Sequence, residues 1–441
     1  MQTLFSKSAK LAAADPSFKH GWVPLGAPSI TNMKAHIKPR VLAVGHGAAA
    51  TGFSRVLDSV IQRLSASYDF HHLATNHRTD RVDGGWPIYG NPDPLDPNDL
   101  ERLGQLLRLL QPEIVLLLND LWFCCVLAHR LQSMPDRPLV IAYCPVDGIL
   151  TRPNLYSVLG VFDQVVAYAQ FGREQLERIN YLDQPLASHC VTKSIETIPH
   201  GVDTDLFFPL QPENFLDRRA AKERFFGAAA VDAEFVVLNA AKHDARKRMD
   251  LTIEGFARFA RNKPAGVKLY LHTGATFDGP DIRILAERAG IGDRLLSTEG
   301  WLEDHPAIDD QRLNLLYNAT DVGINTSGGE GWGLISFEHA ATGAPQIVPS
   351  HSACEELWRD VQTTLPTRDE GEHVGLAMMR QFVAPDDVAA VLERLYSDPH
   401  FRQEQAKKAY ENALQRAYSW DVIAKQWDDL FQRVLALRQR A

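Results

Sequence analysis

The chain has 441 residues, of which 45% are hydrophobic, 23% charged and 9% aromatic. This ordinary globular composition excludes a disordered chain, a fibrous repeat and a small disulfide scaffold, and the length allows two or three domains. Asp and Glu (55) outnumber Lys and Arg (46), giving a net charge of -9, which disfavours nucleic acid as a partner.

The N-terminal end is basic, with six Lys or Arg and one Asp in the first forty residues. We interpret residues 1–39 as a basic N-terminal extension, because Pro16, Pro24 and Pro28 interrupt any long helix. The alternative is a segment that rests on an anionic membrane surface or on a partner protein. The apolar stretch Leu11–Ala14 is too short for a signal peptide, and no apolar run approaches the roughly 18 residues of a membrane span.

The cysteines are few and scattered, and none forms a Cys-x-x-Cys pair. An odd number of scattered cysteines in a long chain favours reduced thiols and a cytoplasmic location, and it argues against structural zinc. We therefore expect a cytoplasmic protein whose closest membrane contact is peripheral, at the inner membrane face. The five residues are Cys124, Cys125, Cys144, Cys190 and Cys354.

From Arg40 onward, short apolar runs alternate with helical stretches. Continuous apolar strands separated by helices predict a parallel sheet that is covered on both faces. We place this first domain at residues 40–208. Its expected strands are Val41–Val44, Ile114–Leu118, Leu139–Tyr143 and Val165–Ala167, and its expected helices include Arg55–Leu64 and Asn98–Leu110.

A second series of strands and helices begins after residue 230. Pro209 and Pro212 stiffen the connector before it, so we place the second domain at residues 209–415. Two doubly wound domains in tandem are therefore expected. The strands of the second domain are predicted at Phe235–Asn239, Val267–Thr273, Asp321–Asn325 and Gln346–Pro349, with a helix at Leu251–Ala260.

The last segment, residues 416–441, is predicted to be an amphipathic helix with Ser419 as its N-cap. Its apolar residues recur at helical spacing and are expected to be buried against one of the domains. They are Ile423, Trp427, Leu430, Phe431 and Val434.

Residues 47–54, Gly-Ala-Ala-Ala-Thr-Gly-Phe-Ser, follow the first expected strand and precede a helix. Such a turn exposes backbone N–H groups that suit a phosphate or a sugar oxygen. A P-loop needs a lysine where Phe53 stands, so an NTPase is excluded, and Gly45 with Gly47 is a weak dinucleotide fingerprint. The alternative is a tight turn without a ligand.

Four cations, Lys242, Arg246, Lys247 and Arg248, lie within seven residues just beyond the expected strand Phe235–Asn239. Open α/β sheets bind ligands at the carboxyl ends of their strands, and clustered cations indicate an anionic ligand such as a diphosphate. The alternative is a solvated run of charge.

The strongest signal is the glycine-rich stretch from Ser327 to Glu338, which precedes a helix that Gly343 and Pro345 end. If a helix filled the interval between Glu330 and Glu338, their separation would be about 12 Å. A paired-carboxylate hydrolase needs about 5–9.5 Å, so the two carboxylates better suit opposite ends of one elongated, polyhydroxylated ligand. A capped helix with two solvated glutamates leaves the four glycines unexplained.

An acidic triplet at Asp203 and Asp205 lies in the connector between the domains and is discounted as a metal site. We predict no metal site.

At these residues the sequence resembles the group-1 (family 4) retaining glycosyltransferases of the GT-B fold. The resemblance runs from about Arg40 to the C-terminus. It rests on Glu330 and Glu338 as an E-x7-E motif and on the stretches KHDARKRMDL, IPHGVDTDLFFP and YSWDVIAKQW. It implies an α/β fold with two Rossmann-like domains facing a central cleft. The first domain would bind the acceptor, the second the nucleotide sugar, and the C-terminal helix would cross back to the first.

The resemblance also implies roles for residues. Glu330 would hold hydroxyls of the donor sugar, Glu338 would bind the ribose, and Lys242 and Lys247 would stabilise the leaving diphosphate. Lys242 stands where the family more often has arginine, and Arg246 would restore the hydrogen-bond donors that are missing there. Arg248 occupies a position that is often glycine. The remaining donor-binding positions implied are Gly52, Gly331, Trp332, Gly333 and Leu334.

On the acceptor side, family members often place a histidine after the strand that corresponds to Leu139–Tyr143. Here Asp147 occupies this segment, and we predict it as the acceptor-side catalytic residue. Asn119 and Asp120, after the preceding strand, are further candidates.

The sequence therefore predicts a retaining glycosyltransferase that moves a sugar from a UDP- or GDP-sugar to a hydroxyl of a glycan, lipid or small-molecule acceptor. It would need no metal and no cofactor, and it would serve bacterial glycan, glycolipid or glycoconjugate synthesis. The alternatives are a non-catalytic GT-B module that binds a sugar or a partner, and a GT-B phosphorylase or epimerase.

Overall fold

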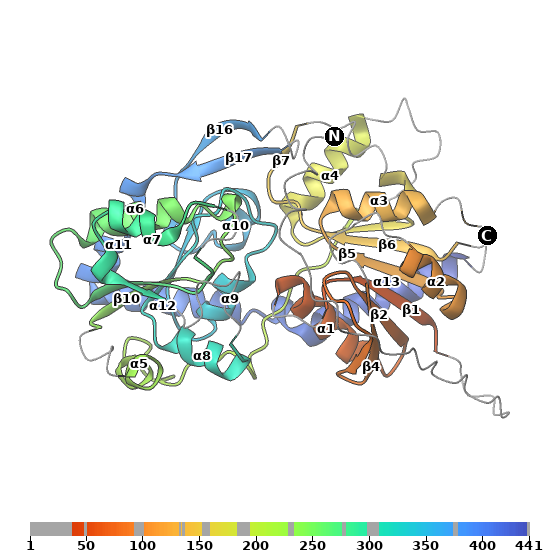
Figure 1. Cartoon of the computed structure of the whole chain (residues 1–441), viewed down its shortest axis with the longest axis horizontal. Helices are drawn as coiled ribbons and strands as arrows, with labels where there is room; N and C mark the ends of the chain where they lie inside the picture. The colour runs from red at the N-terminus through yellow and green to blue at the C-terminus, as the bar shows by residue number, and fades with distance from the viewer. Residues whose placement is uncertain are drawn as a thin grey trace, which may run out of the picture. The chain divides into compact units, whose positions relative to one another are not determined.

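The computed structural model describes most of the chain from Lys38 to Arg438 (Figure 1). The predicted N-terminal extension therefore falls almost wholly outside the described residues. Inside this range, the residues left out are 48–50, 92–100, 132–133, 135–136, 152–158, 183–194, 228–232, 276–278, 298–307 and 374–377.

The first sheet is formed by β1 (Arg40–Gly45), β2 (Asp69–Ala74), β3 (Arg81–Asp83), β4 (Trp86–Gly90), β5 (Ile114–Leu118), β6 (Leu139–Cys144), β8 (Gln164–Ala167) and β9 (Ile195–Thr197). Its order is β3-β4-β2-β1-β5-β6-β8-β9, and only the β3–β4 pair is antiparallel. The described helices that connect its strands are α1 (Gly52–Leu64), α2 (Glu101–Leu110), α3 (Leu121–Leu131) and α4 (Gln170–Leu182).

All four strands predicted for this sheet are present, because their apolar runs are buried by helices on both faces. Strand β2 was not predicted, since it contains the polar pair His71 and His72. The structure buries His72 completely, beneath the turn at Gly47, where an added Cβ would lie 2.6 Å from the imidazole.

The second sheet is parallel throughout, in the order β12-β11-β10-β13-β14-β15. Its strands are β10 (Phe235–Asn239), β11 (Val267–Leu271), β12 (Leu295–Ser297), β13 (Val322–Ile324), β14 (Gln346–Pro349) and β15 (Thr364–Leu365). The helices of this part are α5 (Arg219–Phe226), α6 (Met249–Ala260), α7 (Ile282–Arg288), α8 (Asp310–Asn318), α9 (Leu334–Ala340), α10 (Ser352–Leu357), α11 (Pro385–Ser397) and α12 (Pro399–Ala413).

Helix α9 is shorter than a helix that would span the interval from Glu330 to Glu338. The helix does not fill the interval between Glu330 and Glu338, because it begins only at Leu334. Gly333, with φ of 92°, holds a left-handed conformation that precedes the first helical residue. The continuous helix from which the 12 Å separation was derived is therefore absent between Glu330 and Gly333.

A small third sheet was not predicted. It has the order β16-β17-β7, where β16 (Thr367–His373) and β17 (Met378–Val383) form an antiparallel hairpin and β7 (Ile149–Leu150) follows the first sheet's β6. Strand β17 pairs with β7, so a hairpin that follows β15 of the second sheet reaches the segment after β6 (Figure 1).

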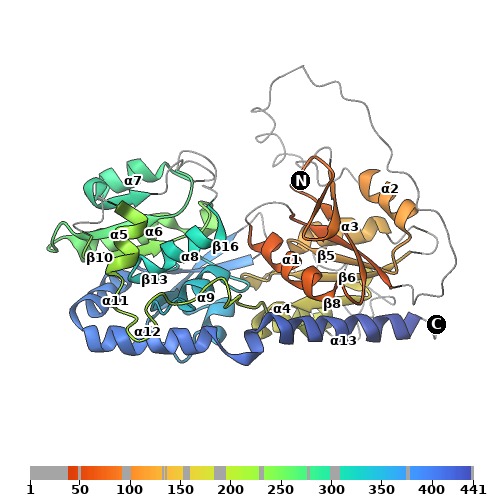
Figure 2. The same cartoon turned by 90° about the horizontal axis from the view of Figure 1, so that it is seen from below.

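The C-terminal helix, α13 (Trp420–Arg438), follows α12 and lies along the side of the first sheet's elements (Figure 2). Its apolar stripe is buried. The ring centroid of Trp427 lies 4.8 Å from that of Tyr143, and the centroid of Phe431 lies 5.2 Å from that of Tyr68. The Tyr68 hydroxyl donates a hydrogen bond to Asp428 at 2.8 Å.

Among the described residues, no helix combines the length and the apolar content needed to cross a membrane. The four described cysteines, Cys124, Cys125, Cys144 and Cys354, are free and buried, while Cys190 lies outside the described residues.

We predict that Trp427→Ala lowers the free energy of unfolding by about 3–5 kcal/mol, because the fully buried indole leaves a large cavity. Urea-induced unfolding followed by circular dichroism measures this. The control is Leu437→Ala on the same helix, where the side chain is 60% exposed and the expected change is within about 0.5 kcal/mol. Equal effects of the two substitutions would contradict the docking of α13 by its apolar stripe.

Candidate functional site

The cationic segment after β10 forms the first wall of the site. Asp244 caps the short helix η4 (Ala245–Lys247), and its Oδ1 accepts hydrogen bonds from the backbone N–H groups of Arg246 at 2.9 Å and Lys247 at 3.1 Å. Arg248 follows with φ of 49°, a conformation that favours glycine, and α6 begins at the next residue. This local geometry directs Arg246 and Lys247 toward the glycine-rich loop.

The glycine-rich loop after β13 forms the second wall and carries Glu330. The Lys247 ammonium forms a close ion pair with Glu330 Oε1, and Arg246 Nη1 lies 3.4 Å from Oε2. Asn325 Nδ2 also donates to Oε1 at 3.3 Å, and the Glu330 N–H donates to Ser352 Oγ at 3.1 Å. The structure thus brings together the predicted residues Glu330, Lys247 and Arg246.

This ion cluster is buried and charged. Burial by itself would raise the pKa of Glu330, but the charges of Lys247 and Arg246 outweigh it and lower the pKa to about 2. Burial also works against the charged form of Arg246, but Asp147 and Glu330 attract its cation and raise the pKa of the guanidinium above its ordinary range. Glu330 therefore stays ionised at neutral pH, as a fixed hydrogen-bond acceptor.

Asp147 joins the same cluster from the segment after β6. Its Oδ2 lies 3.1 Å from Arg246 Nε, so the predicted acceptor-side carboxylate touches the predicted donor-side cation. The loops meet closely, because a Cβ on Gly329 would overlap the carbonyl oxygen of Asp147, and a Cβ on Gly331 would lie 2.8 Å from Pro145 Cβ. Two of the loop's glycines are thus required by backbone approach.

Glu338, on α9, has partners that the sequence analysis missed. Arg55 Nε, from α1, lies 3.2 Å from Glu338 Oε1, and the Tyr317 hydroxyl donates to Oε2 at 3.1 Å. Arg55 also pairs with Asp310 at 2.6 Å. Burial raises the pKa of Glu338, and the charge of Arg55 offsets part of this effect. The only signal for Arg55 in the sequence was its position between the buried residues of an amphipathic helix.

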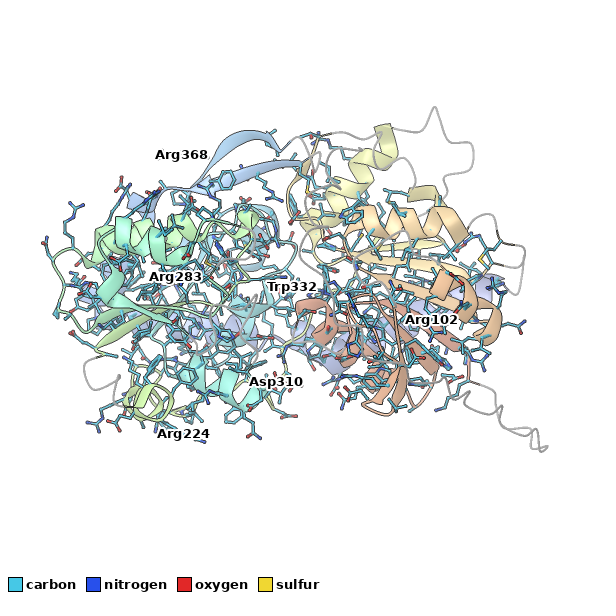
Figure 3. All side chains as sticks on the ribbon, viewed as in Figure 1. Arg102, Arg224, Arg283, Asp310, Trp332 and Arg368 are labelled. Carbon is cyan, nitrogen blue, oxygen red and sulfur yellow. The ribbon has the colours of Figure 1, made fainter. Side chains whose placement is uncertain are left out.

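Apart from Gly52, which begins α1, the remaining donor-side positions lie at the start of α9 or just before it. A Cβ on Gly52 would lie 3.3 Å from Leu334 Cδ1, so the two predicted glycine-rich turns approach each other. Figure 3 shows Trp332 between the parts built on the first and second sheets. Its side chain is buried and stacks on Phe337 with a distance of 5.2 Å between the ring centroids. The indole is therefore part of the core, and only the backbone of Trp332 is left to line the site.

The other predicted residues lie around the cluster. Burial, together with the charge of Lys242, lowers the pKa of His46, which places Lys242 near the turn after β1. Burial and the negative charge of Asp147 raise the pKa of Asp120. The Asn119 side chain accepts a hydrogen bond from the Asp120 N–H at 2.8 Å.

The acidic triplet of the connector has a structural role. Asp203 Oδ1 accepts hydrogen bonds from the backbone N–H groups of Asp205 at 3.1 Å and Leu206 at 3.3 Å, as in an Asx turn. In the part of the chain that the structure describes, no group of three or more His, Cys, Asp or Glu is placed to hold a metal ion.

Comparison with known sequences finds matches to part of the chain. Residues 281–429 match a family model described as glycosyl transferase-like. D-inositol 3-phosphate glycosyltransferase of Xylanimonas cellulosilytica is 28% identical over 194 residues, 43% of this chain and 41% of that protein. Mannosylfructose-phosphate synthase of Agrobacterium fabrum is 28% identical over 199 residues, 43% of this chain and 40% of that protein. The chain thus matches about two fifths of the length of these curated relatives.

Comparison with solved structures covers nearly the whole chain. Sucrose-phosphate synthase from Thermosynechococcus elongatus has a TM-score of 0.69 at 18% identity, covering 91% of this chain and all of that one. Anabaena HepE in complex with UDP-glucose has a TM-score of 0.63 at 14% identity, covering 89% of this chain and 99% of that one. At these identities the likeness establishes the fold, which is GT-B as predicted.

Stability should depend on pH through Glu330. Its pKa of about 2 lies below the ordinary value of 4.5, so ionised Glu330 stabilises the fold above pH 4.5, and this contribution is lost as the pH falls toward 2. We expect Glu330→Gln to lower the free energy of unfolding by about 3 kcal/mol at pH 7, and the difference from wild type to shrink toward pH 3.

Urea unfolding at several pH values between 7 and 3 measures this difference. Glu254→Gln, in an exposed pair with Arg258 on α6, is the control and should stay within about 0.5 kcal/mol of wild type throughout. A difference between Glu330→Gln and wild type that does not change with pH would contradict the lowered pKa.

Proposed function

We propose that this chain, which has the GT-B fold, is a retaining glycosyltransferase of group 1. It transfers a sugar from a nucleoside diphosphate sugar to a hydroxyl of an acceptor. The observation that carries this proposal is the buried cluster in which Lys247 and Arg246 hold the carboxylate of Glu330 at the entrance of α9.

The donor side of the proposal rests on fixed charges. Breaking the bond between the sugar and the diphosphate leaves negative charge on the phosphate oxygens. Lys247, Arg246 and the neighbouring Lys242 supply preorganised positive charge for it, so the reaction proceeds without a metal ion. In the absence of a ligand, the carboxylates of Glu330 and Asp147 neutralise these cations. A bound diphosphate shares the cations with the two carboxylates.

Two carboxylates orient the donor. Glu330, held ionised and nearly buried, accepts hydrogen bonds from hydroxyls of the transferred sugar. Each oxygen of Glu338 already has one partner, Arg55 or Tyr317, and keeps a further lone pair for a ribose hydroxyl. A UDP- or GDP-sugar is the donor class, and the solved neighbour with bound UDP-glucose supports this choice.

Transfer takes place on one face of the sugar. The bond from the anomeric carbon to the diphosphate breaks, the acceptor oxygen bonds to the same carbon, and the acceptor proton passes to the leaving phosphate. Asp147, beside Arg246, orients the acceptor hydroxyl. We place the reaction in bacterial glycan, glycolipid or glycoconjugate synthesis on the cytoplasmic side of the membrane.

Nucleotide binding tests the donor site. We predict that one of UDP, GDP, ADP and dTDP, at 100 times its dissociation constant, stabilises the wild type by about 2.7 kcal/mol. Glu338→Gln should lose most of this stabilisation, because the ribose loses its charged acceptor. Thermal unfolding with and without nucleotide measures it, and Glu404→Gln on α12 serves as the matched surface control. If no nucleotide stabilises the wild type, the transferase proposal fails.

Product analysis tests the chemistry. With a sugar donor of the nucleotide found in this way, we expect Glu330→Gln to retain binding of the nucleoside diphosphate but to lose about 10²–10³ in kcat, because Glu330 holds the transferred sugar. NMR of the product should show the anomeric configuration of the donor, at a rate that EDTA leaves unchanged. An inverted product would refute retention, and phosphate-dependent cleavage without an acceptor would indicate a phosphorylase.

A further inference from the structure

Strand β17 of the third sheet lies against the proposed site. A Cβ on Gly328 would overlap the ring of Phe382, and the Arg248 guanidinium lies 4.3 Å from the centroid of the same ring. On the other side, a Cβ on Gly148, the residue after Asp147, would lie 2.8 Å from the carbonyl oxygen of Met379. The strand therefore borders both the glycine-rich loop and the acceptor-side segment.

Between Met379 and Phe382, β17 carries a buried arginine. Side chains two residues apart share a face of a strand, so Arg380 lies on the same face as Phe382. Arg380 is only 6% exposed. Among the side chains that the structure describes, which do not include those of residues 369–377, its Nε has no hydrogen-bond partner, and no carboxylate oxygen lies within 4.0 Å of its guanidinium.

Arg380 differs in this respect from the other arginines of the site. Arg246 pairs with Asp147 and Glu330, and Arg55 pairs with Glu338. For Arg380, burial is the main cause that lowers its pKa, and the attraction of Asp147 acts only over a longer distance. Burying a guanidinium that forms no ion pair is costly, so a buried arginine that pairs with none of the described carboxylates beside a substrate site indicates an anionic ligand group.

We infer that Arg380 forms an anion subsite for the acceptor, so that the acceptor carries a phosphate monoester or a carboxylate besides its reacting hydroxyl. This inference rests on the proposed function. The diphosphate of the donor already has Lys242, Arg246 and Lys247. Arg380 instead lies on the strand beside Asp147, on the acceptor side, and its planar guanidinium binds either anion through two hydrogen bonds.

Inorganic phosphate is the probe for this subsite. With the donor site filled by saturating UDP, or by the diphosphate that binds best, phosphate should stabilise the wild type at constant ionic strength. In Arg380→Gln we expect its dissociation constant to rise at least about tenfold, because a charge-assisted hydrogen-bonded pair is lost. Arg380→Lys should give an intermediate value, and acetate in place of phosphate tests the carboxylate.

The matched control is Arg368→Gln. Arg368 lies on the neighbouring strand β16, in register with Phe382, but its side chain is exposed (Figure 3). This substitution should leave phosphate binding unchanged. Equal phosphate affinity of wild type and Arg380→Gln, or no stabilisation of the UDP-bound wild type by either anion, would overturn the inference. The second outcome needs no variant, so it holds even if Arg380→Gln fails to fold.

Two further outcomes separate this inference from the proposed function. If Arg380→Gln weakens UDP binding as well, Arg380 serves the donor diphosphate, and the acceptor subsite is refuted while the transferase proposal stands. If no nucleotide binds the wild type, the transferase proposal fails, and the comparison of phosphate binding without nucleotide still decides whether Arg380 binds an anion.

The same pair of variants is then compared in transfer assays with glucose and glucose 6-phosphate as acceptors. We expect kcat/KM of the wild type to favour the phosphorylated sugar, and Arg380→Gln to reduce this preference at least about tenfold through KM. Equal preference in the wild type and in Arg380→Gln would overturn the subsite.

Discussion

The site depends on one buried cation. Arg246 contacts Asp147 from the segment after β6 and Glu330 from the loop after β13, so a single guanidinium ties the two sheets' loops together. Without Arg246, two carboxylates would lie in a poorly hydrated space, with Lys247 paired to Glu330 only, and such a loss costs several kcal/mol. The charges that would stabilise a leaving diphosphate are thus also the charges that hold the loops in place.

Backbone geometry makes this buried cluster possible. The loop with Glu330 comes so close to Asp147 that Gly329 has no room for a side chain, and Gly331 has little against Pro145. Gly333 has a different reason, since its left-handed backbone starts α9 where the loop ends. The glycines therefore place Glu330 and Glu338 at two points of one site. Each of these glutamates pairs with a different arginine from another part of the chain.

Much of this was predictable from sequence. The strands Ile114–Leu118, Phe235–Asn239 and Gln346–Pro349 lie where their apolar runs indicated, because burial on both faces leaves an unmistakable local pattern. The convergence of Lys247 and Glu330 was also predictable, since both follow strands whose carboxyl ends share one edge of a sheet. Strand β2 and the β16–β17 hairpin were missed, since their polar residues carry no such pattern and are ordered by contacts distant in sequence.

The sequence alone did not predict which charged residues form ion pairs with one another. Apolar periodicity, glycine placement and clustered charge are local properties, so the chain alone specified two parallel sheets and the loops that carry the chemistry. Which carboxylate each cation meets depends on residues far apart in the chain: Arg55 pairs with Glu338, and Arg246 with Asp147. Arg380 is the clearest case, because burial and the absence of a nearby carboxylate among the described residues arise only once β17 pairs with β7.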